Sequence, residues 1–361
     1  MLESKHLVAK VALGVFLLAL LVAGCGSGTK TKGAGPQKIP VKECLVTASG
    51  QVEEREVLVP SPPNRVVVLG GGYVAEILQA LGVQDKVVAV DEHTKTKVAW
   101  PDYVAKLPSV GPSNTPNVEE ILALKPDLVV EEFLEPKVKE QLQAAGIPTL
   151  KIYGYKTELL GDEIRTLGKV FEAEKRAEEY ASFIEQQWNE VKRHVAGLPD
   201  VQKPKVYWES SLGNWKTNGK GSGAHPLIEW AGGVNVAAEL GTSYPTVTPE
   251  WVAAKNPDVI IKYAGAPAMG WKGDNKKLEE IRQEIMNRPA LKNTNAVKNG
   301  RIYLISDKIT CAPRGAAGIY YLAKWLHPEL FKDVDPEAVY RDMLERLYGE
   351  ELKGIWVYPQ K

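Results

Sequence analysis

The sequence is poor in cysteine and has no excess of charge of either sign. Its 361 residues include three cysteines, while 45 lysines and arginines balance 45 aspartates and glutamates. Three cysteines cannot build the framework of several disulfides that stabilises small secreted domains, and no CxxC pair indicates a metal or redox site. Cys44 and Cys311 could pair in an oxidising compartment, although free thiols are the simpler expectation. The charge balance provides no basic surface, so we expect no nucleic-acid partner.

The sequence also lacks the common motifs of catalysis. Neither HExxH nor GxSxG is present, and the chain has only five histidines. A hydrolase needs a nucleophile, a base and an orienting group, and a metalloenzyme needs a cluster of ligands. A bare metal ion would need several histidines and carboxylates, and only His93 and His225 are candidates from loops. We therefore expect no enzymatic activity, cofactor or resident metal; a metal-ion binding protein and a lipid-anchored sensor stay open as alternatives.

The first 24 residues have the pattern of a targeting segment. Lys5 and Lys10 precede an apolar run, Val11 to Val22, which is too short to span a bilayer comfortably. Its end, Leu21-Val22-Ala23-Gly24-Cys25, resembles the bacterial lipobox, which implies cleavage before Cys25 and lipid on that residue. An ordinary secretory signal with an incidental cysteine is the alternative. Residues 25–41 are assigned to a flexible tether, so the protein is expected outside the cytoplasm, anchored to the cell membrane by lipid.

The middle of the chain predicts one long helix over residues 157–198. Apolar residues recur at helical spacing, at Leu167, Val170, Phe171, Ala177, Tyr180, Ala181, Ile184, Trp188, Val191 and Val195. Acidic residues cluster at its start and basic residues at its end, as the helix dipole favours. Gly168 is the one weak residue inside. A helix of this length is expected to join two lobes, with a surface helix of a single domain or a coiled-coil arm as the alternative.

On both sides of this helix, short apolar runs alternate with helical segments, which predicts an α/β fold with mostly parallel sheets. The first lobe is assigned to residues 42–156 and opens with a hairpin, Glu43–Thr47 with Arg55–Val59. Its predicted strands are 65–69, 86–90, 128–130 and 149–152, with helices at 73–81, 118–124 and 136–145. The second lobe is assigned to residues 199–361, with strands at 205–209, 259–263 and 301–305 and helices at 226–231, 249–254, 277–286, 315–325 and 336–348.

The two lobes share a repeated unit. Residues 119–130 match residues 250–261 without a gap, at a constant offset of 131: each segment gives a short helix, a Pro-Asp turn and an apolar strand. Residues 76–82 are more weakly similar to residues 226–232. Duplication on either side of one helix predicts two similar lobes with a cleft between them.

Several short motifs follow one another in a characteristic order. They are Asn117-Val118-Glu119, Leu124-Lys125-Pro126-Asp127, Ala145-Gly146-Ile147-Pro148, Leu227-Ile228-Glu229, Ala231-Gly232-Gly233 and Ala312-Pro313-Arg314. From Arg65 to about Leu330 the chain thereby resembles the substrate-binding lipoproteins of ABC importers for ferric siderophores, haem and cobalamin. The resemblance implies a monomer that binds a metal chelate between two lobes joined by a rigid helix. Its partners would be a permease dimer and an ATPase, and it would perform no chemistry.

The resemblance also implies roles for particular residues. One glutamate in each lobe, Glu119 and Glu250, would dock on arginines of the permease, with Glu120 as a competing choice for Glu119. Each glutamate begins a short helix at an equivalent point of a similar lobe, and a role confined to the helix dipole is the alternative. Arg314, in the Pro-Arg motif, would face the ligand, unless it only holds its own loop.

Ligands of α/β sheets gather at the carboxyl ends of the strands. In the first lobe these ends carry residues 70–73, 91–93, 131–133 and 153–155, and in the second lobe residues 210–216, 264–271 and 306–314. From these segments we select Tyr73, His93, Tyr153, Trp215, Lys216, Trp271 and Lys308 as ligand residues beside Arg314. Aromatic and cationic side chains suit a large anionic chelate.

One departure from the family's pattern narrows the choice of ligand. Residues 111–116 hold no tryptophan where one would stack on a corrin, and Lys216 replaces another apolar contact. An anionic ferric chelate, as in siderophores, is therefore the leading expectation, with cobalamin or haem as the alternatives.

Overall fold

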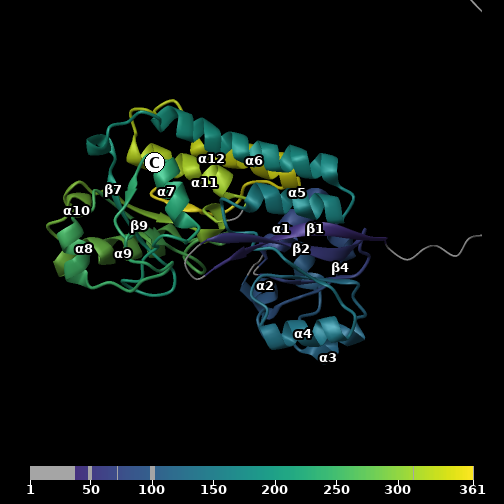
Figure 1. Ribbon diagram of the computed structural model, residues 1–361. Helices are drawn as coiled ribbons and strands as arrows, with labels where there is room; N and C mark the ends of the chain where they lie inside the picture. The colour runs from purple at the N-terminus through teal and green to yellow at the C-terminus, as the bar shows by residue number, and fades with distance from the viewer. Residues whose placement is uncertain (1–36, 48–50, 71, 98–101, 312, 361) are drawn as a thin grey trace, which may run out of the picture. The chain divides into compact units, whose positions relative to one another are not determined.

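The computed structural model describes residues 37–47, 51–70, 72–97, 102–311 and 313–360 (Figure 1). Residues 36–361 form one compact unit. The predicted targeting segment and Cys25 lie outside the described residues, as does Ala312 of the Pro-Arg motif. Within the described part, no helix is long and apolar enough to cross a membrane. Cys44 and Cys311 are both free thiols.

The described chain begins with an antiparallel hairpin of two ten-residue strands, β1 (Gln37–Val46) and β2 (Val52–Ser61). The hairpin was predicted, but it is longer than expected, and the tether assigned to residues 25–41 was wrong at its end. Residues 37–41, which were assigned to the tether, lie in β1, and Val41 belongs to the apolar core of the first lobe. Val41 and Val59 are both buried.

The first lobe is built on a parallel four-stranded sheet in the order β4-β3-β5-β6. The strands are β3 (Val66–Leu69), β4 (Val87–Val90), β5 (Leu128–Glu131) and β6 (Thr149–Lys151), and the helices are α1 (Tyr73–Leu81), α2 (Glu92–Lys97), α3 (Val118–Ala123) and α4 (Pro136–Ala144). Successive residues of β3 enter different apolar clusters: Val66 and Val68 join one, Val67 and Leu69 the other. Because β3 is buried on both faces, its sequence is a continuous apolar run.

The second lobe is built on a five-stranded sheet in the order β11-β10-β9-β7-β8, in which only β11 is antiparallel to its neighbour. The strands are β7 (Lys205–Glu209), β8 (Val234–Asn235), β9 (Val259–Tyr263), β10 (Ile302–Ile305) and β11 (Val357–Tyr358). The helices are α7 (Ala224–Trp230), α8 (Pro249–Lys255), α9 (Asn275–Met286), α10 (Asn295–Lys298), α11 (Gly315–Leu326) and α12 (Pro336–Tyr348). Strands β8 and β11 were not predicted, because two residues carry no periodicity. Short 3₁₀ helices occur at Gln84–Lys86, Asp102–Lys106, Asp200–Gln202, Pro289–Leu291 and Asp307–Ile309.

The predicted single helix over residues 157–198 is wrong. The structure has two helices, α5 (Leu160–Val170) and α6 (Glu174–Val195), separated by a turn in which Glu172 adopts a positive φ of 53°. A Cβ at Gly168 would overlap the Cβ of Ala177, so the glycine that weakens a single helix allows two helices to pack closely. Helix α6, with 22 residues, remains the long helix of the structure and spans about 33 Å.

The repeated unit, in contrast, is confirmed in detail. Lys125 and Asn256, 131 residues apart, both end their helix in the left-handed region, with φ of 48° and 45°. Asp127 accepts hydrogen bonds from two backbone N–H groups at the start of β3, and Asp258 accepts one from the backbone N–H of Lys205. The same carboxylate therefore ties the same helix–strand corner to the neighbouring strand in both lobes, and the α/β fold with two similar, mostly parallel lobes is confirmed.

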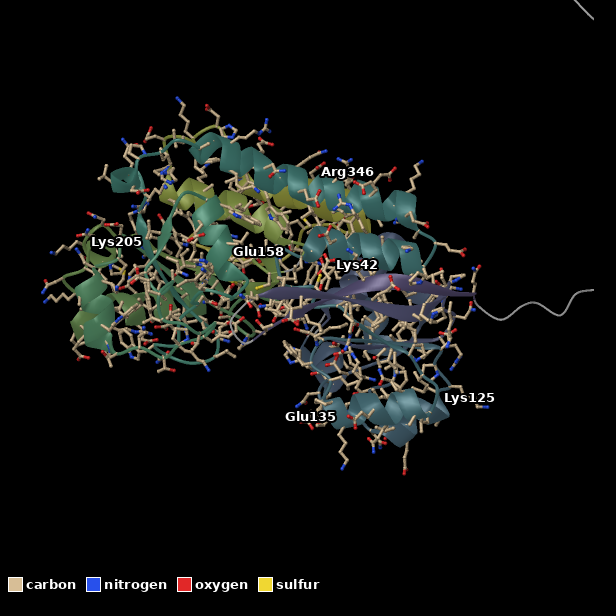
Figure 2. All side chains as sticks on the ribbon, viewed as in Figure 1. Lys42, Lys125, Glu135, Glu158, Lys205 and Arg346 are labelled. Atoms are coloured by element: carbon tan, nitrogen blue, oxygen red, sulfur yellow. The ribbon has the colours of Figure 1, made fainter. Side chains whose placement is uncertain are left out.

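One apolar cluster joins the two lobes. It runs from Val68 in β3 through Ile184 and Trp188 in α6 to Ile261 in β9. Helices α6 and α12 also meet at the surface, where the guanidinium of Arg346 (labelled in Figure 2) lies 5.0 Å from the ring centre of Phe183 in α6. The domain limits at residues 156 and 199 stay a prediction, since the core is continuous across them.

A buried ion pair also crosses between the lobes. Arg314, at the start of α11, donates to Glu76 of α1 at 3.1 Å and to the hydroxyl of Tyr340 at 2.7 Å. Tyr348 donates to the same Glu76 oxygen at 2.7 Å, and its own hydroxyl lies 2.6 Å from that of Tyr180 in α6. Burial raises the pKa of Glu76, and the charge of Arg314 opposes this rise. We name these five residues the interlobe joint.

Replacing Glu76 with alanine should lower the free energy of unfolding by about 3–5 kcal/mol, because the buried Arg314 would lose its nearest carboxylate and keep only Glu350, at 3.8 Å, as an acidic partner. Urea unfolding of the full chain in mild detergent measures this. Glu178→Ala is the matched control, since it breaks an ion pair with Arg165 at the surface and should change the stability far less. Equal losses in the two variants would contradict the importance given to the joint.

Candidate functional site

Aromatic side chains gather where the strands of the first sheet end. Tyr73 begins α1 after β3, Phe133 follows β5, and Tyr153 and Tyr155 follow β6. The ring of Tyr155 lies 6.1 Å from that of Tyr73, 6.2 Å from that of Phe133 and 6.1 Å from that of Tyr153, between ring centres. Since the carboxyl ends of parallel strands share one edge of the sheet, three separate segments form one aromatic wall.

Three lysines lie over rings of this wall. The Nζ of Lys151, which also pairs with Glu131, lies 5.1 Å from the ring centre of Tyr153. The Nζ of Lys308, from the second lobe, lies 5.5 Å from the ring centre of Tyr73, and the Nζ of Lys156 lies 5.4 Å from that of Tyr155. Lys156 also donates to the backbone oxygen of Gly221 in the second lobe at 2.9 Å. We name Tyr73, Phe133, Tyr153, Tyr155, Lys156 and Lys308 the tyrosine cluster. It lies where the two lobes meet.

The cluster is bordered by ionisable groups whose burial disfavours their charge. Burial raises the pKa of Tyr73 well above its ordinary value, and the neighbouring Cys311 and Asp307 add to the rise. Burial also raises the pKa of Glu132, against the opposing charge of Lys151. The pKa of the Cys311 thiol rises to about 11 for the same reason. At neutral pH the phenols are therefore hydrogen-bond donors. Burial lowers the pKa of Lys156, and the neighbouring charges of Glu158 and Glu132 oppose this fall.

Glu163 of α5 positions one edge of the cluster. Its two carboxylate oxygens accept hydrogen bonds from the backbone N–H groups of Tyr153 and Gly154, each at 2.8 Å. The hydroxyl of Tyr153 in turn accepts from the backbone N–H of Val46 in the hairpin at 2.9 Å. Burial raises the pKa of Glu163 to about 7, although the two N–H groups favour its charged form. The loop that carries Tyr155 is thus held by an acid that titrates near neutral pH.

This titration predicts a pH dependence of stability. Because the pKa of Glu163 in the folded chain, about 7, exceeds its ordinary value of 4.5, its contribution is fully present below pH 4.5 and is lost as the pH rises through 7. The lost contribution is about 3 kcal/mol. Urea unfolding at pH 5 and pH 8 should therefore show Glu163→Gln gaining stability relative to the unmodified chain as the pH rises. Glu158 is exposed, so Glu158→Gln is the control, and its free energy of unfolding should change with pH as that of the unmodified chain does. The prediction is contradicted if Glu163→Gln shows that same change with pH.

The structure brings only part of the predicted ligand set together. Tyr73, Tyr153 and Lys308 lie in the tyrosine cluster, whereas Arg314 is 2% exposed and belongs to the interlobe joint. These contacts place Arg314 within the joint, and its role as a ligand residue stays a prediction. Trp271 packs edge-on against Trp356 with ring centres 5.4 Å apart.

Three predicted ligand residues remain, of which Trp215 is described with the cavity below. His93 is exposed in α2, and Lys216 pairs with Thr246 in an isolated β-bridge. His225 lies in α7, not in a loop, and its Nδ1 is 3.2 Å from the side-chain nitrogen of Asn235. Across the described ranges, no group of three or more histidines, cysteines and carboxylates could hold a metal ion.

Sequence reasoning passed over Phe133, Tyr155 and Lys156. Phe133 and Tyr155 stood in the segments expected at the strand ends, so a preference for every aromatic residue there would have found them. Lys156 is one residue beyond its segment. Its role depends on contact with Gly221, 65 residues away, for which the sequence gives no signal.

The two predicted docking glutamates are both exposed, at equivalent positions of the repeat. Glu119 follows the N-cap Asn117 of α3, and Glu250 follows the N-cap Thr248 of α8. Neither carboxylate has a hydrogen bond or ion pair within the part of the chain that the structure describes. Glu120, the competing choice, accepts from the side chain of its own N-cap Asn117 at 3.0 Å, so its carboxylate serves the helix cap.

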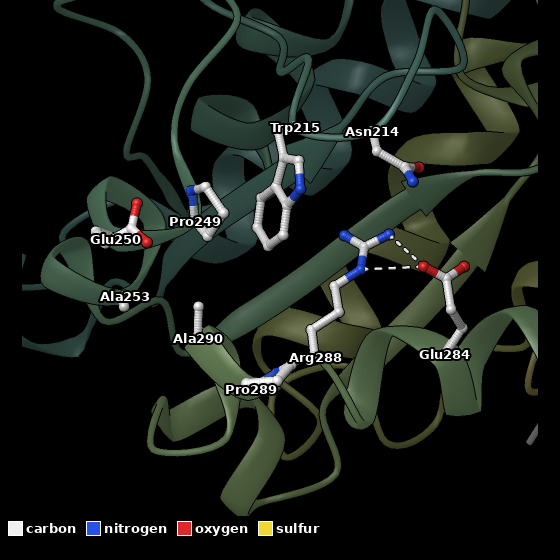
Figure 3. Close-up of a pocket in the computed structure, with 9 residues that line it drawn as sticks. All are labelled: Asn214, Trp215, Pro249, Glu250, Ala253, Glu284, Arg288, Pro289 and Ala290. Atoms are coloured by element: carbon white, nitrogen blue, oxygen red, sulfur yellow. Dashed lines mark hydrogen bonds and ion pairs between the residues drawn. The ribbon is translucent and has the colours of Figure 1, made fainter.

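A cavity of about 660 Å³ lies beside Glu250. Figure 3 shows the indole of Trp215 flanked by Pro249 and Arg288. The other lining residues are Asn214, Ala253, Glu284, Pro289 and Ala290. Trp215, predicted as a ligand residue, therefore lies next to a predicted docking residue.

A buried charge network holds Trp215 in place. Glu209, at the end of β7, accepts hydrogen bonds from Arg288 at 2.6 Å and from the backbone N–H of Trp215 at 3.2 Å, and it pairs with Lys262 at 2.9 Å. Arg288 lies 4.8 Å from the centre of the Trp215 ring and also binds Glu284. Trp215 has a φ of 62°, an unfavourable conformation for a residue with a Cβ, which these contacts maintain.

Comparison with known proteins identifies relatives over most of the chain. A sequence profile described as periplasmic binding protein matches residues 66–309. YvrC of Bacillus subtilis, an uncharacterized ABC transporter substrate-binding lipoprotein, is 26% identical over 90% of this chain and 99% of its own length. The molybdate-binding protein MolA of Haemophilus influenzae is 26% identical over 83% of this chain and 90% of its own length.

Solved structures share the fold. The TroA-like periplasmic binding protein FepB of Veillonella parvula superposes with a TM-score of 0.71 and 24% identity, over 87% of this chain and 99% of that one. MolA bound to molybdate superposes with a TM-score of 0.70 and 22% identity, over 86% of this chain and 99% of that of MolA. The two-lobed architecture is therefore that of a known class.

Proposed function

Since this chain belongs to the periplasmic binding protein family, the substrate-binding proteins of ABC transporters, we propose that its solute is an anionic iron chelate of the ferric siderophore kind. The observation that carries the proposal is the tyrosine cluster, where Lys308 and Lys156 lie over aromatic faces at the carboxyl edge of the first sheet. Aromatic faces stack on a planar or catecholate ligand, and the two ammonium groups neutralise its charge. The solute would be captured between the lobes and released unchanged.

The contacts of the cluster support a capture site that responds to its solute. Lys156 bridges to Gly221, and Thr157 bridges to Gly223 at 3.3 Å, so both hydrogen bonds link the first lobe to the second. An anionic solute would offer Lys156 a stronger, charge-assisted partner than a peptide oxygen. The solute would thus replace one interlobe contact with a contact of its own, while the interlobe joint limits the hinge.

Binding should depend on the charge of Lys308. In the full chain purified in mild detergent, titration with ferric catecholate and ferric hydroxamate chelates, followed by tryptophan fluorescence, should saturate. Lys308→Gln should weaken the binding about tenfold or more, because a charge-assisted contact is lost. Lys298→Gln, a lysine of α10 outside the cluster, is the matched control.

The same titration is repeated with haemin, cobalamin and molybdate. Molybdate enters because MolA is named for it, and an oxyanion would also suit two lysines and neutral phenols. Saturation by cobalamin alone, which needs no ammonium group, would contradict the proposed ligand class. So would chelate binding that is insensitive to Lys308→Gln.

We propose further that Glu119 and Glu250 dock on cationic residues of the permease dimer. They are exposed and occupy equivalent positions of two similar lobes, so one two-fold symmetric partner can meet both. Membrane attachment through lipidated Cys25 would keep the protein near that permease, and YvrC is itself named a lipoprotein.

Replacing both glutamates with glutamine should abolish uptake in cells and leave chelate affinity of the purified chain intact, because neither residue belongs to the tyrosine cluster. Uptake of a radiolabelled chelate is compared with fluorescence titration of the same variant. Glu120→Gln serves as the neighbouring control and should transport normally. Uptake that survives the double replacement would refute the docking role.

A further inference from the structure

Glu132, which follows β5 and precedes Phe133 of the tyrosine cluster, is a buried acid without a partner. It is 5% exposed, and among the residues that the structure describes its carboxylate accepts no hydrogen bond and forms no ion pair. A buried polar group that stays unpaired costs free energy and weakens the fold. Stability therefore gives no reason for an acid at this position.

Three other buried acids at the same edge of the sheet do have donors. Asp91 and Glu163 each accept from two backbone N–H groups. Glu131 pairs with Lys139 at 3.2 Å and with Lys151 at 3.4 Å. Lys151 also donates to the backbone oxygen of Glu132, so its ammonium group is already bound on both sides. The nearby donors are thus taken by the neighbours of Glu132.

These surroundings favour the neutral form of Glu132. Burial raises its pKa well above the ordinary value; the charge of Lys151 opposes the rise, and the charges of Glu163, Asp91 and Glu131 add to it. Lys156 is a further cation near enough to interact with an ionised Glu132. A carboxyl group among like charges and without donors of its own keeps its proton. In that form it is a hydrogen-bond donor as well as an acceptor.

The carboxyl group of Glu132 also lies close to the phenols of the proposed solute site. Burial raises the pKa of Tyr155, and the nearby Glu132 adds to the rise. Glu132 makes a smaller contribution of the same kind at Tyr73 and at Tyr244 of the second lobe, where burial again dominates. Its Oε2 lies 3.8 Å from the position that a Cβ would take at Gly70, in the loop before α1. Glu132 therefore lies between the sheet edge and the tyrosine cluster.

We propose that Glu132 is a ligand residue of the solute site, which keeps its proton and donates a hydrogen bond to an anionic oxygen of the solute. The inference rests on the proposed function and adds the residue and the proton. An ionised carboxylate would repel the anion that Lys308 and Lys156 attract, whereas the acid form adds a charge-assisted hydrogen bond. Capture would then need one proton on Glu132, and a rise in pH that removes this proton would weaken the affinity.

Glutamine separates this role from the opposite one. If the solute carried a cationic group instead, Glu132 would act as an ionised acceptor, and Glu132→Gln would lose that attraction. If the neutral acid donates, glutamine replaces it well, because its amide has the same shape, no charge and N–H donors. Alanine has neither a donor nor a charge, so Glu132→Ala is the matched comparison.

The first test measures affinity against pH. The full chain, purified in mild detergent, is titrated at pH 7, 8 and 9 with the ferric complex of a hexadentate tris-catecholate, followed by tryptophan fluorescence. At pH 7, Glu132→Gln should bind within about twofold of the unmodified chain, whereas Glu132→Ala should bind about fivefold more weakly. The ratio of the Glu132→Gln affinity to that of the unmodified chain should then rise at least about fivefold by pH 9, because only the glutamate can lose a proton.

Three results of this titration would overturn the proposal. One is a Glu132→Gln affinity as low as that of Glu132→Ala at pH 7. Another is an affinity ratio that stays constant between pH 7 and pH 9. The third is an equal rise in the ratio for Glu158→Gln, an exposed acid outside the cluster, which would show a general effect of charge. If no solute saturates the unmodified chain, the proposed function is refuted, and the ligand role of Glu132 with it.

The second test observes the proton directly and needs no solute. In a detergent without ester groups, the infrared spectrum of the unmodified chain minus that of Glu132→Gln should show the C=O stretch of a protonated carboxylic acid at pH 7. Adding the ferric tris-catecholate should move this band to lower frequency, because a new hydrogen bond forms. A missing band at pH 7 would overturn the proposal while chelate binding leaves the proposed function standing. A band that the bound chelate does not move would overturn the contact between Glu132 and the solute.

Discussion

The arrangement of the two lobes depends on the buried contact between Arg314 and Glu76. The guanidinium is 2% exposed, so it must find its partners within the protein, and its hydrogen bonds go to Glu76 of α1 and Tyr340 of α12. Buried ion pairs contribute little net free energy compared with apolar packing, since desolvation offsets their attraction. Their geometry is demanding, however, and we interpret the joint as the contact that fixes how the lobes meet.

The joint also positions the proposed solute site. Tyr73 precedes Glu76 by one helical turn, and Lys308 precedes Arg314 by six residues, so the ion pair that joins α1 to α11 brings Tyr73 under Lys308. On the other side, Glu163 holds the Tyr153–Gly154 backbone. The tyrosine cluster is therefore assembled by the buried acids Glu76 and Glu163, while in the proposed function its lysines supply the charge that a solute would meet.

Much of the fold could be predicted, because patterns of a few neighbouring residues determine its strands and helices. The apolar runs of β3, β5 and β9 and the 131-residue repeat gave the two parallel sheets and the equivalent positions of Glu119 and Glu250. The long helix failed for a physical reason: one periodicity continues through α5 and α6, and only the overlap of Gly168 with Ala177 shows that the chain turns back. Of the predicted ligand residues, Tyr73 and Tyr153, which follow β3 and β6 of the first sheet, were brought together, since parallel strands share one edge.

The sequence by itself determined the α/β class, the duplication and the segments that end each strand, because periodicity, caps and turns act over a few residues. Only the tertiary structure decided which side chains of different segments contact one another. It paired Arg314 with Glu76 across 238 residues and placed Trp215 over Arg288, beside Glu250. A charge or a ring in a sequence carries no information about its distance from residues in other elements. Packing sets that distance, and with it which groups an arginine contacts.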